Sequence, residues 1–367
     1  MTTLAVLALV GGFGVSAASA QAAVELCQGH PVTIAATATG VPVTGTEGSD
    51  VIGVGRFTDV QIDAKGGDDI VCGGRWSTIY GGPGADSFSG VPSTTLAYSD
   101  AASGVDIDLA SGSVLDGGEV DTVAGIHRVQ GSPYDDTFVG TAGRDDYNSG
   151  DYYTPELEDV LVHGDTVDAG AGDDTVRVRL GDVDLGAGDD LATVAGGTVN
   201  GGAGDDELYL VTSGVANGGP GADIIRPSVS TEEFGEPQED ARLLVNGGAG
   251  RDVIVHPVAY TVGEFCPGVC AVGDLRGGPG RDVLTFLSRG AVDLAVGKAR
   301  SAHSRSQVRS VESVVGSDED DVLRGNAARN RLVGNGGRDV LVGRGGRDVA
   351  VGGTGRDRCV AEVRRSC

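Results

Sequence analysis

The feature that most constrains this chain is a short glycine-rich motif closed by an acidic residue, repeated along the sequence. Near the C-terminus five copies follow one another in steps of nine residues, beginning at Gly316, Gly325, Gly334, Gly343 and Gly352. Each copy places an Asp or Asn five positions after its first glycine. Clustered glycines permit sharp turns with positive φ. So short a unit cannot bury an apolar face alone, which predicts that neighbouring copies stack.

An apolar position follows each turn at a fixed distance. Two residues after the Asp or Asn stand Leu323, Leu332, Leu341, Ala350 and Cys359. We expect these side chains to point into the interior from very short strands. With two nine-residue units in each coil, one ladder contains Asp321, Asp339 and Asp357, and a second ladder contains Asn330 and Asp348.

A central block repeats the motif with a longer step. Asp174, Asp190 and Asp206 are 16 residues apart, and Asp223 follows after 17. Segments between them alternate apolar and polar residues, which is typical of strands with one buried face. The central block is therefore predicted to carry one glycine-aspartate turn per coil, and the C-terminal block two.

Composition favours many thin strands over a few thick helices. Glycine accounts for 64 of 367 residues, aromatic residues for only 4%, and hydrophobic residues for 40%, mostly Val, Leu, Ala and Ile. The β-branched and small residues suit short strands. We predict an all-β fold, a parallel β-helix or β-roll solenoid built from glycine-aspartate repeats.

Stacked carboxylates about 5 Å apart repel one another unless a cation lies between them. Calcium fits such turns because it takes about 6–8 oxygen ligands from carboxylates and main-chain carbonyls. The alternative is that each Asp only caps its own turn, but the fixed spacing of fifteen copies favours several bound Ca²⁺ ions. The predicted ligands are Asp50, Asp69, Asp86, Asp136, Asp145, Asp174, Asp190, Asp206, Asp223, Asp252, Asp282, Asp321, Asp339, Asp348 and Asp357.

On these motifs the chain resembles the RTX, or hemolysin-type, calcium-binding repeat family over most of residues 45–360. The resemblance implies a parallel β-roll in which the turn Asp residues and nearby carbonyls hold Ca²⁺ between coils. Two stretches look like segments that interrupt such arrays, one running from Gly104 to Asp136 and the other from Ala291 to Asp321.

The charge of the chain restricts its partners. A formal net charge of -26 argues against nucleic acid, since phosphate binding requires positive charge. Residues 298–367 differ, with 14 Lys and Arg against 9 Asp and Glu. Cell-wall or extracellular polysaccharide, or protein, remain open as partners.

The N-terminus has the pattern of an export signal. The apolar run Leu4–Val10 is too short to span a bilayer, and Ala18-Ser19-Ala20 is an acceptable cleavage site. No other stretch is long and apolar enough for a membrane helix. We predict a signal peptide at residues 1–23 and an extracellular, secreted protein.

The six cysteines form an even set, typical of an oxidising compartment. We expect disulfides between Cys359 and Cys367, between Cys266 and Cys270, and between Cys27 and Cys72. A zinc site made of Cys266, Cys270 and His256 is the alternative.

Three insertions interrupt the repeats, at residues 147–155, 227–240 and 255–272, and they are either tolerated surface loops or recognition patches. The sequence contains neither H-E-x-x-H nor G-x-S-x-G. We therefore expect no catalytic centre.

The predicted divisions are the signal peptide, an N-terminal repeat region at 24–150, a central region at 151–297 and a C-terminal β-roll with a Cys cap at 298–367. The predicted function is calcium binding that drives folding, in a structural or interaction role. The alternatives are a polyuronide lyase or epimerase on a parallel β-helix, and a calcium-dependent surface adhesin.

Overall fold

A computed structural model describes residues 25–150, 164–230, 241–260 and 271–367. The predicted signal peptide, Cys266 and Cys270 lie outside the described residues, as do parts of all three insertions. The described residues contain strands and turns and no helix. It follows that none of them forms a helix able to cross a membrane.

The N-terminal region contains short strands, most of three residues: β1 (Leu26–Cys27), β2 (His30–Pro31), β3 (Ile34–Ala35), β4 (Val43–Thr44), β5 (Val51–Gly53), β6 (Gln61–Asp63), β7 (Ile70–Cys72), β8 (Thr78–Tyr80), β9 (Ser87–Ser89), β10 (Thr95–Ala97), β11 (Asp106–Asp108), β12 (Ser113–Asp116), β13 (Glu119–Ala124), β14 (Arg128–Gln130), β15 (Thr137–Val139) and β16 (Asp146–Asn148).

Longer strands form what we call the central stack, residues 165–285: β17 (Asp165–Asp168), β18 (Thr175–Asp184), β19 (Leu191–Asn200), β20 (Glu207–Gly221), β21 (Ile224–Ser230), β22 (Ala241–Gly250), β23 (Val253–Val255), β24 (Val258–Tyr260), β25 (Ala271–Arg276) and β26 (Val283–Thr285).

The C-terminal strands are β27 (Ala291–Asp293), β28 (Lys298–Arg300), β29 (Ser304–Arg309), β30 (Ser313–Val315), β31 (Val322–Arg324), β32 (Arg331–Gly337), β33 (Val340–Val342), β34 (Val349–Gly355), β35 (Arg358–Val360) and β36 (Val363–Arg365).

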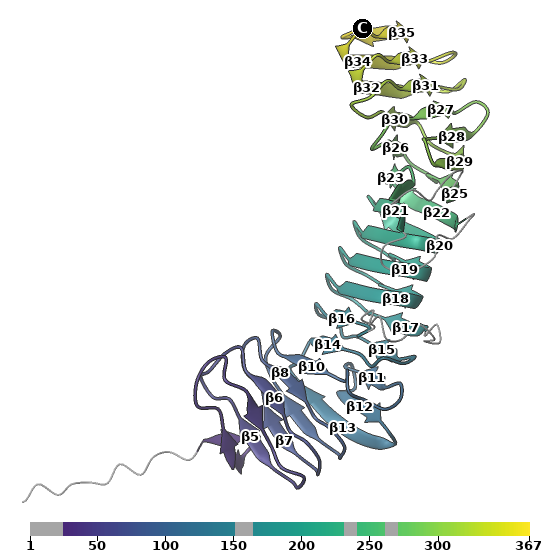
Figure 1. The fold of residues 1–367 in the computed structure, drawn as a ribbon. Helices are drawn as coiled ribbons and strands as arrows, with labels where there is room; N and C mark the ends of the chain where they lie inside the picture. The colour runs from purple at the N-terminus through teal and green to yellow at the C-terminus, as the bar shows by residue number, and fades with distance from the viewer. Residues whose placement is uncertain (1–24, 151–163, 231–240, 261–270) are drawn as a thin grey trace, which may run out of the picture.

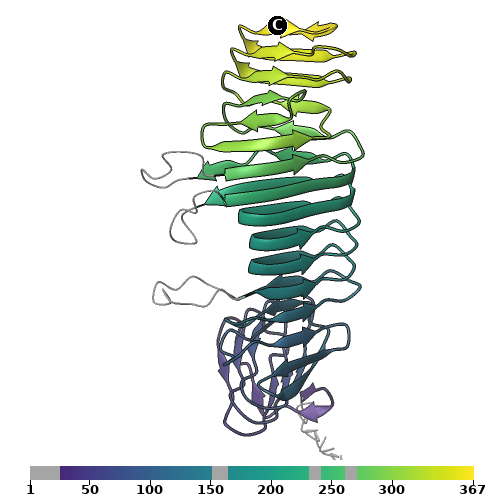
Figure 2. The same ribbon diagram turned by 90° about the vertical axis from the view of Figure 1, so that its right-hand side faces the viewer.

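All strands except the β1–β2 hairpin belong to one sheet of 34 strands, in which most pairs are parallel. A strand commonly pairs with the next but one, as in β5–β7–β9 and β31–β33–β35. The strands consequently stack as rungs, with those from β16 onward in one column and those of the N-terminal region turned at an angle to it (Figures 1 and 2). The predicted all-β class with a large, mostly parallel sheet is confirmed.

The core follows the apolar positions that the repeat predicts. In a typical three-residue strand only the middle side chain is buried, because successive side chains point to opposite faces. Leu323 lies opposite Leu341, and Leu341 opposite Cys359, in adjacent parallel rungs. These interior positions therefore form one continuous column of apolar contacts.

Two antiparallel excursions break the parallel stacking. Strands β11, β12 and β13 pair antiparallel, and so do β27, β28 and β29. They lie within the two stretches that the family resemblance marked as interruptions. Parallel pairing resumes on either side, between β9 and β13 and between β25 and β29.

Two of the three predicted disulfides are confirmed. Cys27 is bonded to Cys72, which ties β1 to β7 across 45 residues, and Cys359 is bonded to Cys367 beyond the last rung. The bridge between Cys266 and Cys270 stays a prediction.

Candidate metal centres in the stacked turns

Every predicted Asp occupies the same structural position, directly before a strand at the end of its turn. Thirteen of the fifteen side chains are between 0% and 2% exposed, while Asp50 and Asp357 are half-buried. Buried carboxylates require partners, because removing an ionised group from water carries a large free-energy penalty. The question is which groups satisfy each of the two oxygens.

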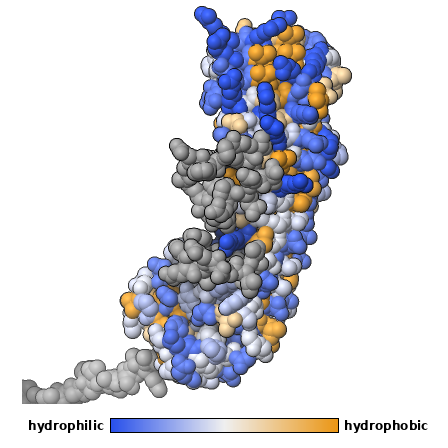
Figure 3. All heavy atoms as spheres, turned by 45° about the vertical axis from the view of Figure 1, so that its right-hand side comes forward, coloured by the Kyte–Doolittle hydropathy of each residue, from blue (hydrophilic) through white to orange (hydrophobic). Residues whose placement is uncertain are grey.

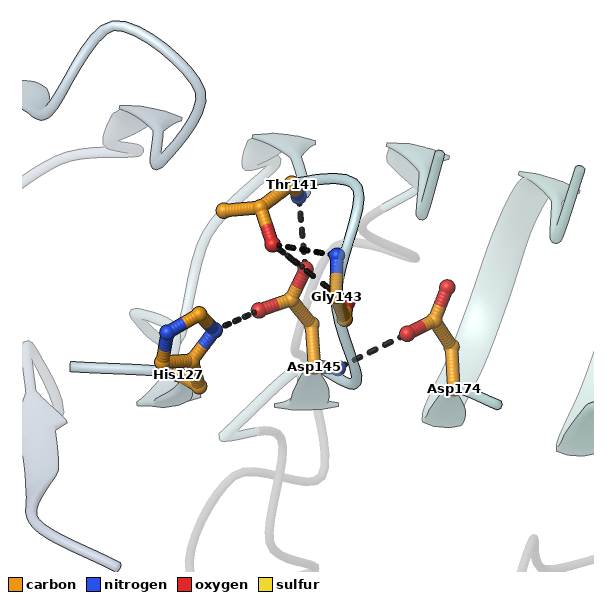
Figure 4. Close-up of polar contacts among 5 residues, drawn as sticks. All are labelled: His127, Thr141, Gly143, Asp145 and Asp174. Atoms are coloured by element: carbon orange, nitrogen blue, oxygen red, sulfur yellow. Dashed lines mark hydrogen bonds and ion pairs between the residues drawn. The ribbon is translucent and has the colours of Figure 1, made fainter. Parts of the chain in front are cut away.

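One oxygen of each carboxylate is used within the rungs. Asp145 donates its main-chain N–H to Asp174 Oδ1 at 2.7 Å (Figure 4). Asp174 does the same to Asp190 Oδ1 at 2.7 Å. The pattern continues without interruption through the central stack. This long ladder consists of Asp145, Asp174, Asp190, Asp206, Asp223, Asp252 and Asp282 and ends on Glu312.

The C-terminal block has the two ladders that its nine-residue step predicts. The N–H of Asp321 donates to Asp339 Oδ1 and that of Asp339 to Asp357 Oδ1. On the opposite side Asn330 donates to Asp348 Oδ1 at 2.8 Å. The prediction that successive repeats alternate between two ladders is confirmed.

The second oxygen is different, because in most turns nothing donates to it. Among the described residues, Oδ2 is buried without a hydrogen-bond partner in Asp69, Asp86, Asp174, Asp190, Asp206, Asp223, Asp252, Asp282, Asp339 and Asp348. A buried oxygen without a donor is rare in folded proteins. Ten of them in the same position of a repeat indicate a ligand.

Main-chain oxygens approach these orphaned carboxylate oxygens. A Cβ built on Gly247 would lie 2.5 Å from both Asp252 Oδ2 and Gly277 O. Carboxylate and carbonyl oxygens likewise surround the Cβ positions of Gly201, Gly218 and Gly334. The first glycine of the motif is thus required by close approach, and it leaves two acceptor oxygens facing one small space.

This donor set fits calcium. Both oxygens are hydrogen-bond acceptors, and hard oxygen ligands of this kind are those that Ca²⁺ prefers. The described residues contain no group of three or more His, Cys, Asp or Glu side chains placed to hold a metal. Any cation in these turns must therefore draw several of its ligands from the main chain.

The family model of the RTX calcium-binding nonapeptide repeat matches in four copies, at residues 124–151, 164–185, 315–350 and 325–359. The chain carries RTX-type calcium-binding repeats. No curated protein matches it. Two of the matched segments lie in the C-terminal block, and the other two lie where the long ladder begins.

Burial raises the pKa of orphaned carboxyl groups such as those of Asp86, Asp174 and Asp206. The pKa of Asp86 and that of Asp174 rise to about 7, and that of Asp206 to about 6. The usual value is about 3.9. Loss of hydration is the largest cause, and main-chain N–H groups of the neighbouring rung oppose it. In the absence of a cation these groups therefore bind protons at a higher pH than an exposed Asp does.

The repeat motif misses four acidic members of the ladders. Asp121 and Asp165 are buried and accept the N–H of Asp86 and of Asp136. Glu312 and Glu362 occupy equivalent positions with a longer side chain. None stands five positions after a glycine, as the Asp or Asn of each C-terminal copy does. The remaining signal, shared by Asp121, Asp165 and Glu312, is a valine two positions later.

His256 is the histidine of the zinc alternative. It is 1% exposed, stacks on the Phe286 ring at 4.7 Å and faces Ser304 Oγ through Nδ1. Burial lowers its pKa to about 4, so the ring is neutral. The zinc alternative also needs Cys266 and Cys270, which lie outside the described residues.

Proposed function

We propose that this is a secreted calcium-binding repeat protein whose turns hold Ca²⁺ between stacked rungs and fold around it. The observation that carries the proposal is the set of buried Oδ2 atoms that face main-chain carbonyls without a donor. Such an arrangement has uncompensated negative charge until a cation enters. The proposed calcium sites lie at the turns between rungs, along the Asp ladders.

The residues that would hold calcium are the orphaned Asp side chains together with glycine carbonyls of the adjacent rung. At one turn these are Asp252 Oδ2 and Gly277 O. At another they are Asp206 Oδ2 and Gly218 O. Because each set joins two rungs, it exists only after the rungs have stacked, and calcium binding is then coupled to folding.

We further propose that the rungs close into a β-roll solenoid and that the protein acts outside the cell as a structural or interaction module. Extracellular calcium modules typically bind at about 10⁻⁴–10⁻³ M. The two described disulfides suit an oxidising compartment. We propose that residues 24–150, 151–297 and 298–367 are three regions of this stack.

The test is far-UV circular dichroism of residues 24–367, first in EDTA and then in millimolar Ca²⁺. The expected result is a large gain of β signal on adding Ca²⁺, and none on adding the same concentration of Na⁺. An unchanged spectrum together with no calcium bound in equilibrium dialysis would overturn the proposal.

One surface supports a second candidate function, calcium-dependent adhesion to an anionic polymer. A groove of about 460 Å³ has apolar Val292 and Ala299 in its lining and includes Lys298, Arg300, Arg305 and Arg324. All four cationic side chains are exposed. Hydrophobic side chains gather between hydrophilic ones near the C-terminal end of the face shown in Figure 3.

This candidate is tested by calcium-dependent pull-down with a polyuronate, using a neutral polysaccharide of similar length as the control. Retention on the polyuronate alone supports adhesion. New reducing ends or double bonds in the polymer would instead favour the polyuronide enzyme, and absence of retention would overturn the adhesin.

A further inference from the structure

The turns are of two kinds, although the sequence motif treats them alike. We call five of them self-capped turns: residues 45–50, 131–136, 140–145, 316–321 and 325–330. In each, the main-chain N–H of the second residue donates to the side chain of the sixth. The five N–H donors are Thr46, Ser132, Thr141, Ser317 and Asn326, at 2.6 to 2.8 Å from their acceptors.

The second side chain strengthens each self-capped turn. Thr141 Oγ1 donates to Asp145 Oδ2 at 2.9 Å and accepts the N–H of Gly143 at 3.0 Å (Figure 4). Ser317 makes the corresponding pair of bonds with Asp321 Oδ2 and with the N–H of Glu319. The chain itself thus supplies the donors that the Oδ2 atom lacks elsewhere.

We call the other eleven turns open turns: residues 64–69, 81–86, 169–174, 185–190, 201–206, 218–223, 247–252, 277–282, 334–339, 343–348 and 352–357. Their second residue always has a left-handed backbone, whether it is glycine or not: Lys65, Gly82, Gly170, Gly186, Gly202, Gly219, Gly248, Gly278, Asn335, Arg344 and Gly353. No second residue of a self-capped turn has positive φ.

This backbone difference explains the orphaned oxygens. With a left-handed second residue the N–H points out of the turn, as at Gly202, which donates to Gly218 O at 2.9 Å. All ten orphaned Oδ2 atoms belong to open turns, and none belongs to a self-capped turn. The conformation of one residue therefore determines whether the carboxylate receives donors from the chain.

We infer that calcium binds only in the open turns, and that the self-capped turns fold without a cation. This inference rests on the proposed function and divides its predicted ligands, removing Asp50, Asp136, Asp145 and Asp321. A further observation agrees with it. The one turn that ends in an amide, at Asn330, is self-capped, where a negative charge is unnecessary.

The order of the turns gives the self-capped ones a role. Self-capped turns at 45–50, 131–145 and 316–330 each precede a run of open turns, at 64–86, 169–282 and 334–357. Each calcium-dependent run thus starts on a rung that is complete without calcium. Such a rung offers a preformed edge on which the next open turn can stack.

The decisive experiment compares Asp321→Asn with Asp339→Asn in residues 24–367. The two residues are buried in adjacent rungs of one ladder. Asn keeps the Oδ1 acceptor, which receives the N–H of Gly290 at position 321 and the N–H of Asp321 at position 339. Bound calcium is counted by equilibrium dialysis with atomic emission. We expect Asp339→Asn to lose at least one ion and Asp321→Asn to keep the wild-type number.

Thr141→Gly provides a test that does not depend on losing a ligand. Removing the hydroxyl and freeing the backbone should convert a self-capped turn into an open one and add one bound ion. Thr141→Ser, which keeps the hydroxyl, is the matched control and should add none. Circular dichroism in Ca²⁺ checks that both variants are folded.

The outcomes separate the two proposals. If the wild-type chain binds no calcium, the proposed function fails. If the wild-type chain binds calcium but Asp321→Asn loses as many ions as Asp339→Asn, or Thr141→Gly gains none, the proposed function stands and this inference is overturned.

Discussion

The N-terminal region and the central stack close their turns in different ways. In the N-terminal region buried hydroxyls take part. Thr94 Oγ1 donates to Gly74 O and accepts the N–H of Val91, and Ser77 Oγ accepts the N–H of Gly74. In the central stack six consecutive carboxylates, from Asp174 to Asp282, have an oxygen with no donor.

The cores of the two regions also differ, in the size of the buried side chains. The N-terminal rungs bury Phe88, Phe138 and Tyr147, whereas the central rungs bury smaller side chains such as Ala192 and Ala216. Aromatic side chains contribute large buried apolar areas. The N-terminal region therefore has more internal stabilisation, although its open turns at Asp69 and Asp86 also lack a donor, whereas every orphaned turn of the central stack depends on an external cation. Three experiments test this contrast.

Removing calcium should produce the largest difference. In excess EDTA we expect the amides of β18–β22 to exchange nearly as fast as in an unfolded chain, and those of β14–β16 to stay at least about 100-fold more protected. Hydrogen exchange read by mass spectrometry measures both in one sample. The control is the same chain in millimolar Ca²⁺, and uniform loss of protection would break the comparison.

A change of pH in EDTA should have an intermediate effect. Burial raises the pKa of Asp174 to about 7 and those of Asp190, Asp206, Asp223 and Asp282 to about 6. The folded state therefore binds protons more tightly than the unfolded state. This stabilisation is complete below about pH 4 and is lost as the pH rises through 6 and 7.

The expected result is that Tm in EDTA is higher at pH 5 than at pH 8, by about 5 °C or more. In millimolar Ca²⁺ the difference should shrink, because the cation replaces the protons. Thermal melts followed by circular dichroism measure it. A Tm in EDTA that rises between pH 5 and pH 8 would contradict the assignment.

The smallest effect should come from Tyr147→Phe. Tyr147 is fully buried, stacks on Phe138 at 4.5 Å and donates its hydroxyl to Asp165 Oδ2 at 3.1 Å. Loss of that bond should destabilise the N-terminal region by about 1–3 kcal/mol. Urea unfolding in millimolar Ca²⁺, in which both regions are folded, measures the change.

Tyr209→Phe is the matched control, because the Tyr209 hydroxyl bonds to half-buried Glu207 in the central stack. Its effect should be within about 0.5 kcal/mol. Equal effects of the two substitutions would show that the N-terminal region does not depend specifically on internal donors.

Much of the fold could be predicted because the repeat fixes it locally. The nine-residue step placed Leu323 opposite Leu341 and Asp321 next to Asp339, and the structure confirms both. A fixed spacing gives a fixed register whenever successive units have equal length. The pairing of Cys359 with Cys367 followed from the position of Cys359 at the last interior site.

Other ladder members could not be predicted because long excursions separate them from their partners. Asp86 pairs with Asp121 across 35 residues, and the antiparallel strands β11 to β13 set that register. The difference between self-capped and open turns was also missed. The spacing is the same in both, and the distinguishing signal is the second residue, which is Ser or Thr in four of the five self-capped turns and in none of the open turns.

The ladder bonds all point the same way, so the stack has a direction. Each rung donates its N–H to a carboxylate that arrives later in the chain, from Asp145 through Asp282 to Glu312. In a chain that folds from its N-terminus, the growing edge of the ladder therefore presents a main-chain N–H that still lacks its acceptor. Each new rung completes the previous one and exposes an identical edge, so the array extends by templated, one-way growth.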